Sequence, residues 1–199
     1  MAIASTVAPG KQNTSFSGKL VYGLAGESKI AKWLRKKGYG VIPAYEKIID
    51  TGKGPQIFTA KRNLVAPDLL VWKSHKTTWI EAKRKNAFTY YRIGGRWVTG
   101  IDLNHYGDYC EVEKTTPWPV WLLFLQEGGQ AKDHPQNEKN SPAGLFGNQL
   151  AYLREHESHQ SQNHGRHGMV YWGIDDLNLI ATLDEVNAAQ ENPNPKENK

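Results

Sequence analysis

Residues 67–83, PDLLVWKSHKTTWIEAK, indicate the fold more clearly than any other segment. The segment contains two runs rich in apolar, aromatic and β-branched residues, 67–72 and 77–83, which are typical of β-strands. The polar residues 74–76 between the runs are typical of a turn. The stretch therefore predicts a β-hairpin.

Alternation along the two strands places the charged residues of this hairpin on one face. With a turn centred between residues 75 and 76, Asp68 would lie opposite Lys83, and Leu70 opposite Glu81. Asp68 and Glu81 would then be diagonal neighbours, roughly 7–8 Å apart at the backbone, so that both carboxylates could reach one cation. The opposite face has the composition of a core. It carries Leu69, Val71, Ile80 and Ala82.

Two carboxylates on one sheet face repel each other, which raises their affinity for a proton or a divalent cation. Oxygen ligands with open coordination positions favour Mg²⁺, and Mn²⁺ should also support activity. Such a site suits phosphodiester hydrolysis, because the cation polarises the phosphate and lowers the pKa of a bound water. Lys83 can orient that water and offset developing charge. The main-chain carbonyl of Ala82 could complete the ligand set.

Pro67-Asp68 followed by Glu81-Ala82-Lys83 resembles the signature of the PD-(D/E)XK nucleases, the restriction-endonuclease-like superfamily. The resemblance covers roughly residues 26 to 126 and is nearest to resolvase-like or phage-type members. It implies an α/β fold: an αβββαβ core whose central mixed β-sheet is flanked by helices. It also implies that Asp68 and Glu81 bind the metal and that Lys83 is the catalytic lysine.

A helix is expected from about Gly26, ending before Gly38. Glu27 stands at its start, where resolvase-like members carry an additional acid, and the resemblance implies a metal ligand or a water-positioning residue. Glu27 also precedes Ile30 and Leu34 at helical spacing, which turns it inward. The alternative is that it only complements the helix N-terminus. Glu46 is a weaker candidate for the same role.

Basic residues around these elements are candidate nucleic-acid contacts, because the formal net charge is +5 and phosphates attract cations. Three lie on one face of the first helix, four flank the signature, and two belong to a predicted hairpin at 87–98 that is rich in aromatic residues. They are Lys29, Lys32, Lys36, Lys61, Arg62, Arg84, Lys85, Arg92 and Arg96. The alternatives are a solvated helix face and, for the hairpin, an ordinary β-arm or a dimer contact.

Beyond the signature, we expect one nuclease domain at 19–190, after a flexible leader at 1–18 and before a disordered tail at 191–199. Within that domain, residues 127–166 are rich in polar residues and glycine and are predicted to be an exposed insertion. The remaining expected elements are a helix at 102–114 capped by Asp102, strands at 119–126 and 169–174, and a helix at 175–189. The resemblance to resolvase-like nucleases implies that the helix at 102–114 lies near the active site.

The leading hypothesis is a Mg²⁺-dependent nuclease, with a DNA endonuclease favoured, either structure-selective or restriction-like. The residues do not distinguish DNA from RNA, and a homodimer is an open alternative. A single cysteine, Cys110, excludes a disulfide framework and favours a cytoplasmic location, and no apolar run is long enough to cross a membrane.

Two alternatives belong to other classes. The first is a catalytically silent DNA-binding or scaffold protein on the same fold. The second is a histidine-based metal-binding module in the polar insertion, although its histidines are irregularly spaced and no cysteine accompanies them. The histidines concerned are His156, His159, His164 and His167.

Overall fold

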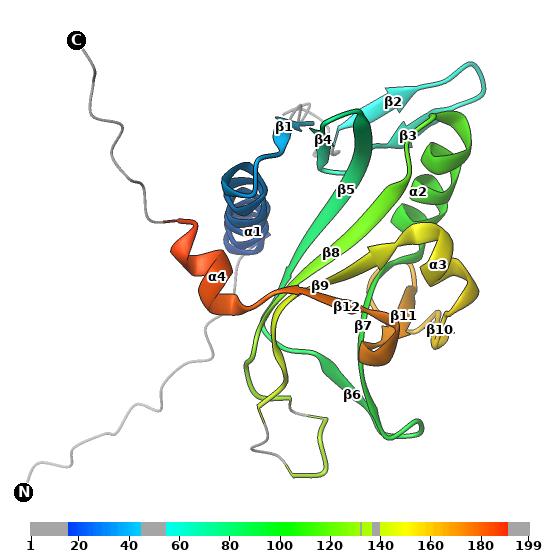
Figure 1. Cartoon of the computed structure of the whole chain (residues 1–199). Helices are drawn as coiled ribbons and strands as arrows, with labels where there is room; N and C mark the ends of the chain where they lie inside the picture. Colours follow the sequence, from blue (N-terminus) through cyan, green and yellow to red (C-terminus); the bar gives the residue numbers. More distant parts are fainter. Residues whose placement is uncertain (1–15, 45–54, 132, 137–139, 191–199) are drawn as a thin grey trace, which may run out of the picture.

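The computed structural model describes residues 16–44, 55–131, 133–136 and 140–190 (Figure 1). Most of the expected leader, the expected tail and Glu46 lie outside these residues. The helices are α1 (Phe16–Lys36), α2 (Leu103–Thr115), α3 (Leu150–Glu155) and α4 (Leu183–Ala188), with a 3₁₀ turn at Ile174–Asp176. The strands are β1 (Gly40–Pro43), β2 (Gln56–Phe58), β3 (Asn63–Val65), β4 (Leu69–Lys73), β5 (Lys76–Lys85), β6 (Thr89–Tyr91), β7 (Arg96–Asp102), β8 (Val120–Glu127), β9 (Ala143–Gln149), β10 (His159–Ser161), β11 (Met169–Gly173) and β12 (Asn178–Ala181).

A six-stranded mixed sheet forms the centre of the fold, in the order β1-β4-β5-β8-β9-β12. Only β5 and β8 are parallel neighbours, while the other adjacent pairs are antiparallel. α1, then β1, β4 and β5, then α2 and β8 follow one another along the chain, interrupted by the β2–β3 and β6–β7 pairs. The predicted α/β class, with a mixed sheet flanked by helices and an αβββαβ core, is confirmed.

The hairpin of β4 and β5 has a different register from the predicted one. Lys73 pairs with Lys76 around a two-residue turn in which Ser74 has a left-handed backbone (φ 56°). Leu70 therefore faces Trp79, and the predicted pairing of Leu70 with Glu81 is wrong by two residues. A shift by an even number of residues leaves every side chain on its predicted face, so the separation of charged and apolar faces survives.

α1 and α4 cover one face of the sheet (Figure 1). Ile30 and Leu34 of α1 pack there against the apolar face of the hairpin. The predicted helix is present but begins earlier, at Phe16, so that residues 16–18 of the expected leader are helical. None of the helices in the described ranges is long and apolar enough to span a bilayer.

α2, α3 and a second, four-stranded sheet lie on the other face (Figure 1). The second sheet has the order β10-β11-β7-β6 and consists of antiparallel neighbours. The α2 prediction is confirmed, including its cap: the Asp102 side chain accepts a hydrogen bond from the Asn104 amide at 2.9 Å. Tyr109 and Val112 of α2 enter the core on this side.

Two segments differ from the sequence-based expectations. Residues 143–149, inside the expected polar insertion, form β9 in the central sheet, where Leu145 is fully buried. The expected helix at 175–189 is split, because Asn178–Ala181 is an edge strand beside β9 and the helix starts only at Leu183. Thr182 caps that helix by accepting a hydrogen bond from the Glu185 amide at 3.2 Å.

Candidate active site

The two acids of the signature lie beside each other at the edge of the β4–β5 pairing. Asp68 comes one residue before Leu69, whose partner on β5 is Ile80, so Asp68 is level with Glu81. One carboxylate oxygen of Asp68, Oδ2, accepts a hydrogen bond from the Ala82 amide at 2.9 Å. The register therefore brings the two acids closer together than the predicted diagonal arrangement would.

Glu81 is the most deeply buried charged residue of the site. Its exposed fraction is 0%, so both of its carboxylate oxygens are shielded from solvent. Lys83, on the same face of β5, forms an ion pair with Oε1 of Glu81. A fully buried carboxylate is unfavourable unless it is paired, so this ammonium is its main local compensation.

One lysine beside two acids leaves an excess of negative charge. Burial raises the pKa of Asp68, and the Glu81 charge raises it further, whereas Lys83 and the Ala82 amide lower it; the net result is a pKa of about 7. For Lys83, burial alone would lower the pKa, but the charges of Glu81 and then Asp68 raise it above its ordinary value. Lys83 is therefore charged at neutral pH, and Asp68 is poised to exchange a proton for a cation.

α2 places two further residues against this group, as predicted for a helix near the active site. Tyr109 is buried, and burial, followed by the charges of Glu81 and Asp68, raises the pKa of its hydroxyl well above the ordinary value. Burial and the charge of Lys83 lower the pKa of His105, against the opposing charges of Asp102 and Asp108. Sequence reasoning did not identify Tyr109 as a site residue.

The two basic residues that follow the signature separate onto opposite faces of β5. Lys85, two residues after Lys83, points to the same face of β5 as Glu81. Burial, followed by the charge of Lys83, lowers the pKa of Lys85 to about 8. Arg84 lies against α1, where its Cβ approaches Gly26, and its Nε donates to Glu127 at 2.7 Å. Of this pair, only Lys85 therefore shares a face of β5 with Glu81 and Lys83.

Glu27 lies half-buried near the middle of α1 instead of at its N-terminus, since the helix begins at Phe16. Its charge reaches Lys83, where it is the smallest of the contributions that raise the pKa of that lysine. Glu27 does not join Asp68 and Glu81 in a compact ligand cluster, because the described residues contain no group of three His, Cys, Asp or Glu side chains placed to hold one metal. It stands at the periphery of the site.

Asp68 and Glu81 suit a cation that keeps water in its coordination shell. Mg²⁺ commonly binds proteins through one or two carboxylates and retains several waters, so two adjacent acids are a sufficient protein contribution. The raised pKa of Asp68 and the buried Glu81 oxygens both indicate that a divalent cation would relieve local repulsion. The chemistry of the donor set therefore fits magnesium.

The predicted lysine face of α1 lies against α4. The Lys36 ammonium donates to the Ala188 carbonyl at 3.0 Å, and the Lys29 ammonium donates to Asn187 at 3.4 Å. Lys32 is exposed between them along the same helix. The helix is on the face of the sheet opposite Glu81, so these lysines are not grouped with the acids.

The other predicted contacts divide between the β2–β3 connection and the second sheet. Lys61 is exposed in that connection, next to Arg62, which forms an ion pair with Asp108 of α2 at 2.8 Å. Arg92 donates to the Asp133 carbonyl and Arg96 donates to Ser158, each at 2.8 Å. Both arginines thus have anchoring roles within the second sheet and its neighbouring segments.

The histidines of the expected insertion make aromatic and backbone contacts. His159 stacks between Tyr91 and Tyr171, with ring centroids 4.1 and 4.6 Å away. His156 stacks on Tyr152 at 3.9 Å, and His164 lies against Tyr171. In the part of the chain that is described, they form no metal-binding cluster.

Two solved structures are among those to which the chain is similar. The chain is similar to Hjc, a Holliday junction resolvase from the archaeal hyperthermophile Archaeoglobus fulgidus, with a TM-score of 0.46, 9% identity, and coverage of 77% of this chain and 90% of the resolvase. It is also similar to D212, a nuclease from a fusselovirus, with a TM-score of 0.36, 9% identity, and coverage of 93% and 95%. No family model and no curated protein matches the sequence.

Proposed function

We propose that this protein is a Mg²⁺-dependent nuclease that hydrolyses phosphodiester bonds in DNA, with Mn²⁺ as an alternative cation. One observation carries the proposal: Asp68 and the fully buried Glu81 lie side by side, with the Lys83 ammonium on the same face. A structural role does not require two adjacent acids in a core, because apolar residues of similar size would be at least as stable there.

Asp68 and Glu81 would hold the cation, and the Ala82 carbonyl is a candidate additional ligand. Bound there, Mg²⁺ would supply Lewis-acid polarisation of the phosphate and a water of lowered pKa. The Asp68 oxygen that accepts from the Ala82 amide is held in place by that bond, which fixes the direction of the carboxylate. The protein therefore contributes a preorganised pair of ligands.

Lys83 would place its ammonium next to the reacting phosphate. In the metal-free protein the charges of Glu81 and Asp68 raise its pKa, so that the ammonium is protonated at neutral pH. Its role is then to bind a phosphate oxygen or to orient the attacking water, and to offset charge that develops in the transition state. Glu27, at the periphery, would position water or Lys83.

Further proposals concern the kind of cleavage, the cellular location, the oligomeric state and the residues that contact the DNA backbone. We favour an endonuclease, structure-selective or restriction-like, acting in the cytoplasm. A homodimer would let two such sites cut two strands. Lys61 is exposed, Arg62 pairs with Asp108 of α2, and Lys85 shares a face of β5 with Lys83, so these three are the backbone contacts that we favour.

The test is a cleavage assay with Mg²⁺ or Mn²⁺ on duplex, single-stranded and branched DNA, and on RNA of matched sequence. Asp68→Asn, Glu81→Gln and Lys83→Met should each lower the cleavage rate by about a hundredfold or more while the far- and near-UV circular dichroism stays native. Glu155→Gln, which changes an exposed acid of α3, is the matched control and should cleave normally.

A folded wild-type protein that binds these substrates but cuts none of them would contradict the nuclease proposal and favour the silent DNA-binding alternative. Normal cleavage by Glu81→Gln would contradict the assignment of the site. Cleavage of RNA alone would correct the substrate class and leave the site intact.

A further inference from the structure

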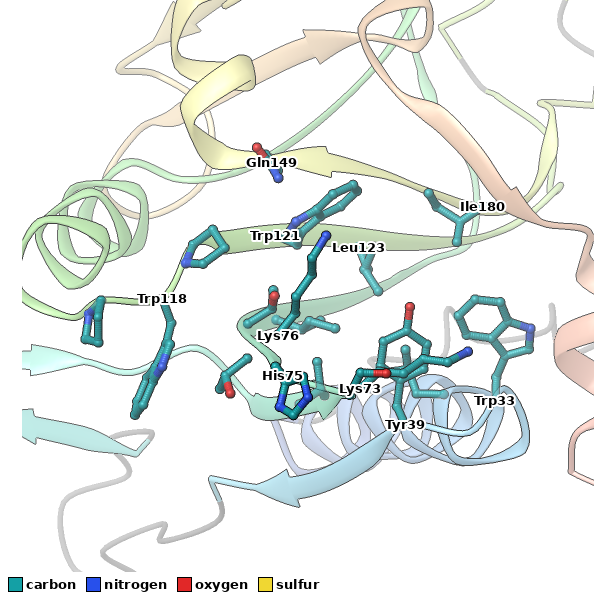
Figure 2. Close-up of a pocket in the computed structure, with 18 residues that line it drawn as sticks. Trp33, Tyr39, Lys73, His75, Lys76, Trp118, Trp121, Leu123, Gln149 and Ile180 are labelled. Atoms are coloured by element: carbon teal, nitrogen blue, oxygen red, sulfur yellow. The ribbon is translucent and has the colours of Figure 1, made fainter.

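A second feature lies on the sheet face opposite the acids. It is an open hollow of about 980 Å³, beside the C-terminal end of α1 and the tip of the β4–β5 hairpin (Figure 2). Its floor is formed by alternate residues of the central strands, among them Val71, Ile80 and Leu123. These residues belong to the same core cluster as the apolar residues of α1. The hollow lies beyond the end of α1, where none of the described helices covers this face of the sheet.

Aromatic side chains stand around this floor. Trp121 comes from the start of β8 and Trp118 from the connection before it, while Trp33 comes from the last turn of α1 and Tyr39 from the residues after that helix (Figure 2). Trp121 is half-exposed although it packs on the core cluster, which leaves part of its indole accessible. Accessible indole and phenol rings are surfaces on which planar bases stack.

The charges at the rim are of one sign. Lys73, His75 and Lys76 line the hollow at the tip of the hairpin, and no Asp or Glu is among its described lining residues. Lys73 also lies 5.0 Å from the centre of the Tyr39 ring, so cation and aromatic ring are already associated. Figure 2 shows Lys76 reaching over the hollow from the hairpin. This combination favours a partner that is both anionic and aromatic.

We infer that the hollow is a binding site for single-stranded nucleic acid, in which Trp121 stacks on a base and Lys76 contacts the phosphate backbone. An unpaired strand supplies planar bases and one negative charge per nucleotide, and it fits an open groove better than a base-paired duplex, whose bases are covered. An acidic peptide would satisfy the lysines but would leave the indole and phenol rings without stacking partners.

Binding in the hollow would be a function separate from cleavage at the acidic site. Ile80 lines the hollow whereas Glu81 faces α2, so strand alternation places the hollow and the acids on opposite sides of β5. Binding in the hollow therefore needs neither a divalent cation nor the acids. A substrate with an unpaired branch could be held on one face while it is cut on the other.

The test measures binding by fluorescence anisotropy in EDTA, with the full chain and a labelled oligonucleotide of about twelve thymidines. An abasic oligomer of the same length keeps the phosphates and lacks the bases. The wild type should bind the thymidine oligomer more tightly. Trp121→Leu should weaken that binding about tenfold and leave binding of the abasic oligomer unchanged.

Two further variants complete the design. Trp72 is more exposed than Trp121 and lies on the β4–β5 hairpin, but it does not line the hollow. The Trp72→Ala variant should therefore bind the thymidine oligomer like the wild type. Lys76→Ala replaces an exposed side chain and should make the dependence of log K on log salt shallower by about 0.7. This variant tests the site even if Trp121→Leu fails to fold.

Three results would overturn the inference. The first is equal binding of the thymidine and abasic oligomers by the wild type. The second is unchanged thymidine binding by Trp121→Leu together with an unchanged salt dependence in Lys76→Ala. The third is that polyglutamate competes as strongly as unlabelled thymidine oligomer. Each is independent of cleavage, because every measurement is made in EDTA and can be repeated in Asp68→Asn.

Discussion

The two faces of the β4–β5 hairpin differ in what they bury. Toward α1, four apolar side chains are each at most 5% exposed: Leu69, Val71, Ile80 and Ala82. Toward α2, Glu81 is equally buried but charged, beside Asp68 and Lys83. The first face is explained by the hydrophobic effect, whereas the second lowers stability, which a functional role would explain.

This difference shows how one strand can serve packing and chemistry. Neighbouring residues of β5 point to opposite faces, so the rigid core under α1 fixes the backbone from which Glu81 and Lys83 project. Stability and activity should therefore respond separately to substitutions on the two faces.

The largest expected effect is on the acidic face. Glu81→Gln should reduce the single-turnover cleavage rate by about a hundredfold or more, because it removes one of two cation ligands. The free energy of unfolding should change little, because Asp68 remains beside the Lys83 ammonium when one of the two mutually repelling acids is neutralised. Urea unfolding and a quenched cleavage assay measure the two quantities. A rate within tenfold of wild type would refute the functional reading of this face.

The next effect is on the apolar face. Ile30→Ala, at a fully buried position of α1, should lower the free energy of unfolding by about 3 kcal/mol, because it leaves a cavity against the sheet. Cleavage at a temperature where the variant remains folded should change less than twofold. A large loss of cleavage in the folded variant would show that the two faces are not separable.

The pH dependence of stability should come from the acidic face. The pKa of Asp68 in the folded protein, about 7, lies above its unfolded value of 3.8, so the folded state binds more protons between these values. In EDTA, the free energy of unfolding should therefore fall as the pH rises from about 4 to about 7, by about 2 kcal/mol after allowing for partial exposure.

Asp68→Asn provides the control for this pH effect, because asparagine does not titrate. Thermal unfolding midpoints across this pH range should show a smaller decline in the variant than in the wild type. Identical pH profiles would contradict the assignment of the shifted group to Asp68.

The smallest effect is expected at the aromatic neighbour of the acids. Tyr109→Phe should slow cleavage about fivefold, because it removes a buried hydroxyl that interacts with Glu81 and helps to position it. Tyr152→Phe, an exposed tyrosine of α3, is the matched control. A rate for Tyr109→Phe equal to that of the control would limit Tyr109 to packing.

The hairpin and its faces could be predicted because strand alternation depends only on local sequence. The register could not: the turn at Ser74–His75 requires a left-handed serine, and the sequence does not distinguish this turn from one placed a residue later. Tyr109 was missed for a related reason, since its approach to Glu81 depends on how α2 packs on the sheet.

β9 was missed because AGLFGNQ, residues 143–149, has the glycine content of a loop. In the structure, a Cβ at Gly147 would lie 2.4 Å from the Leu122 carbonyl oxygen, so glycine permits the close approach of β9 to β8. The predicted helix at 175–189 was wrong in its first half, although the capping pair Thr182 and Glu185 marks the true start in the sequence.

The central claim is that Asp68 and Glu81 bind one catalytic divalent cation. The most direct measurement is anomalous diffraction from crystals of the wild type soaked in Mn²⁺ at a concentration that supports cleavage. We predict a single strong peak between the carboxylates of Asp68 and Glu81, absent from crystals of Glu81→Gln. A peak elsewhere, with none between these two acids, would contradict the account.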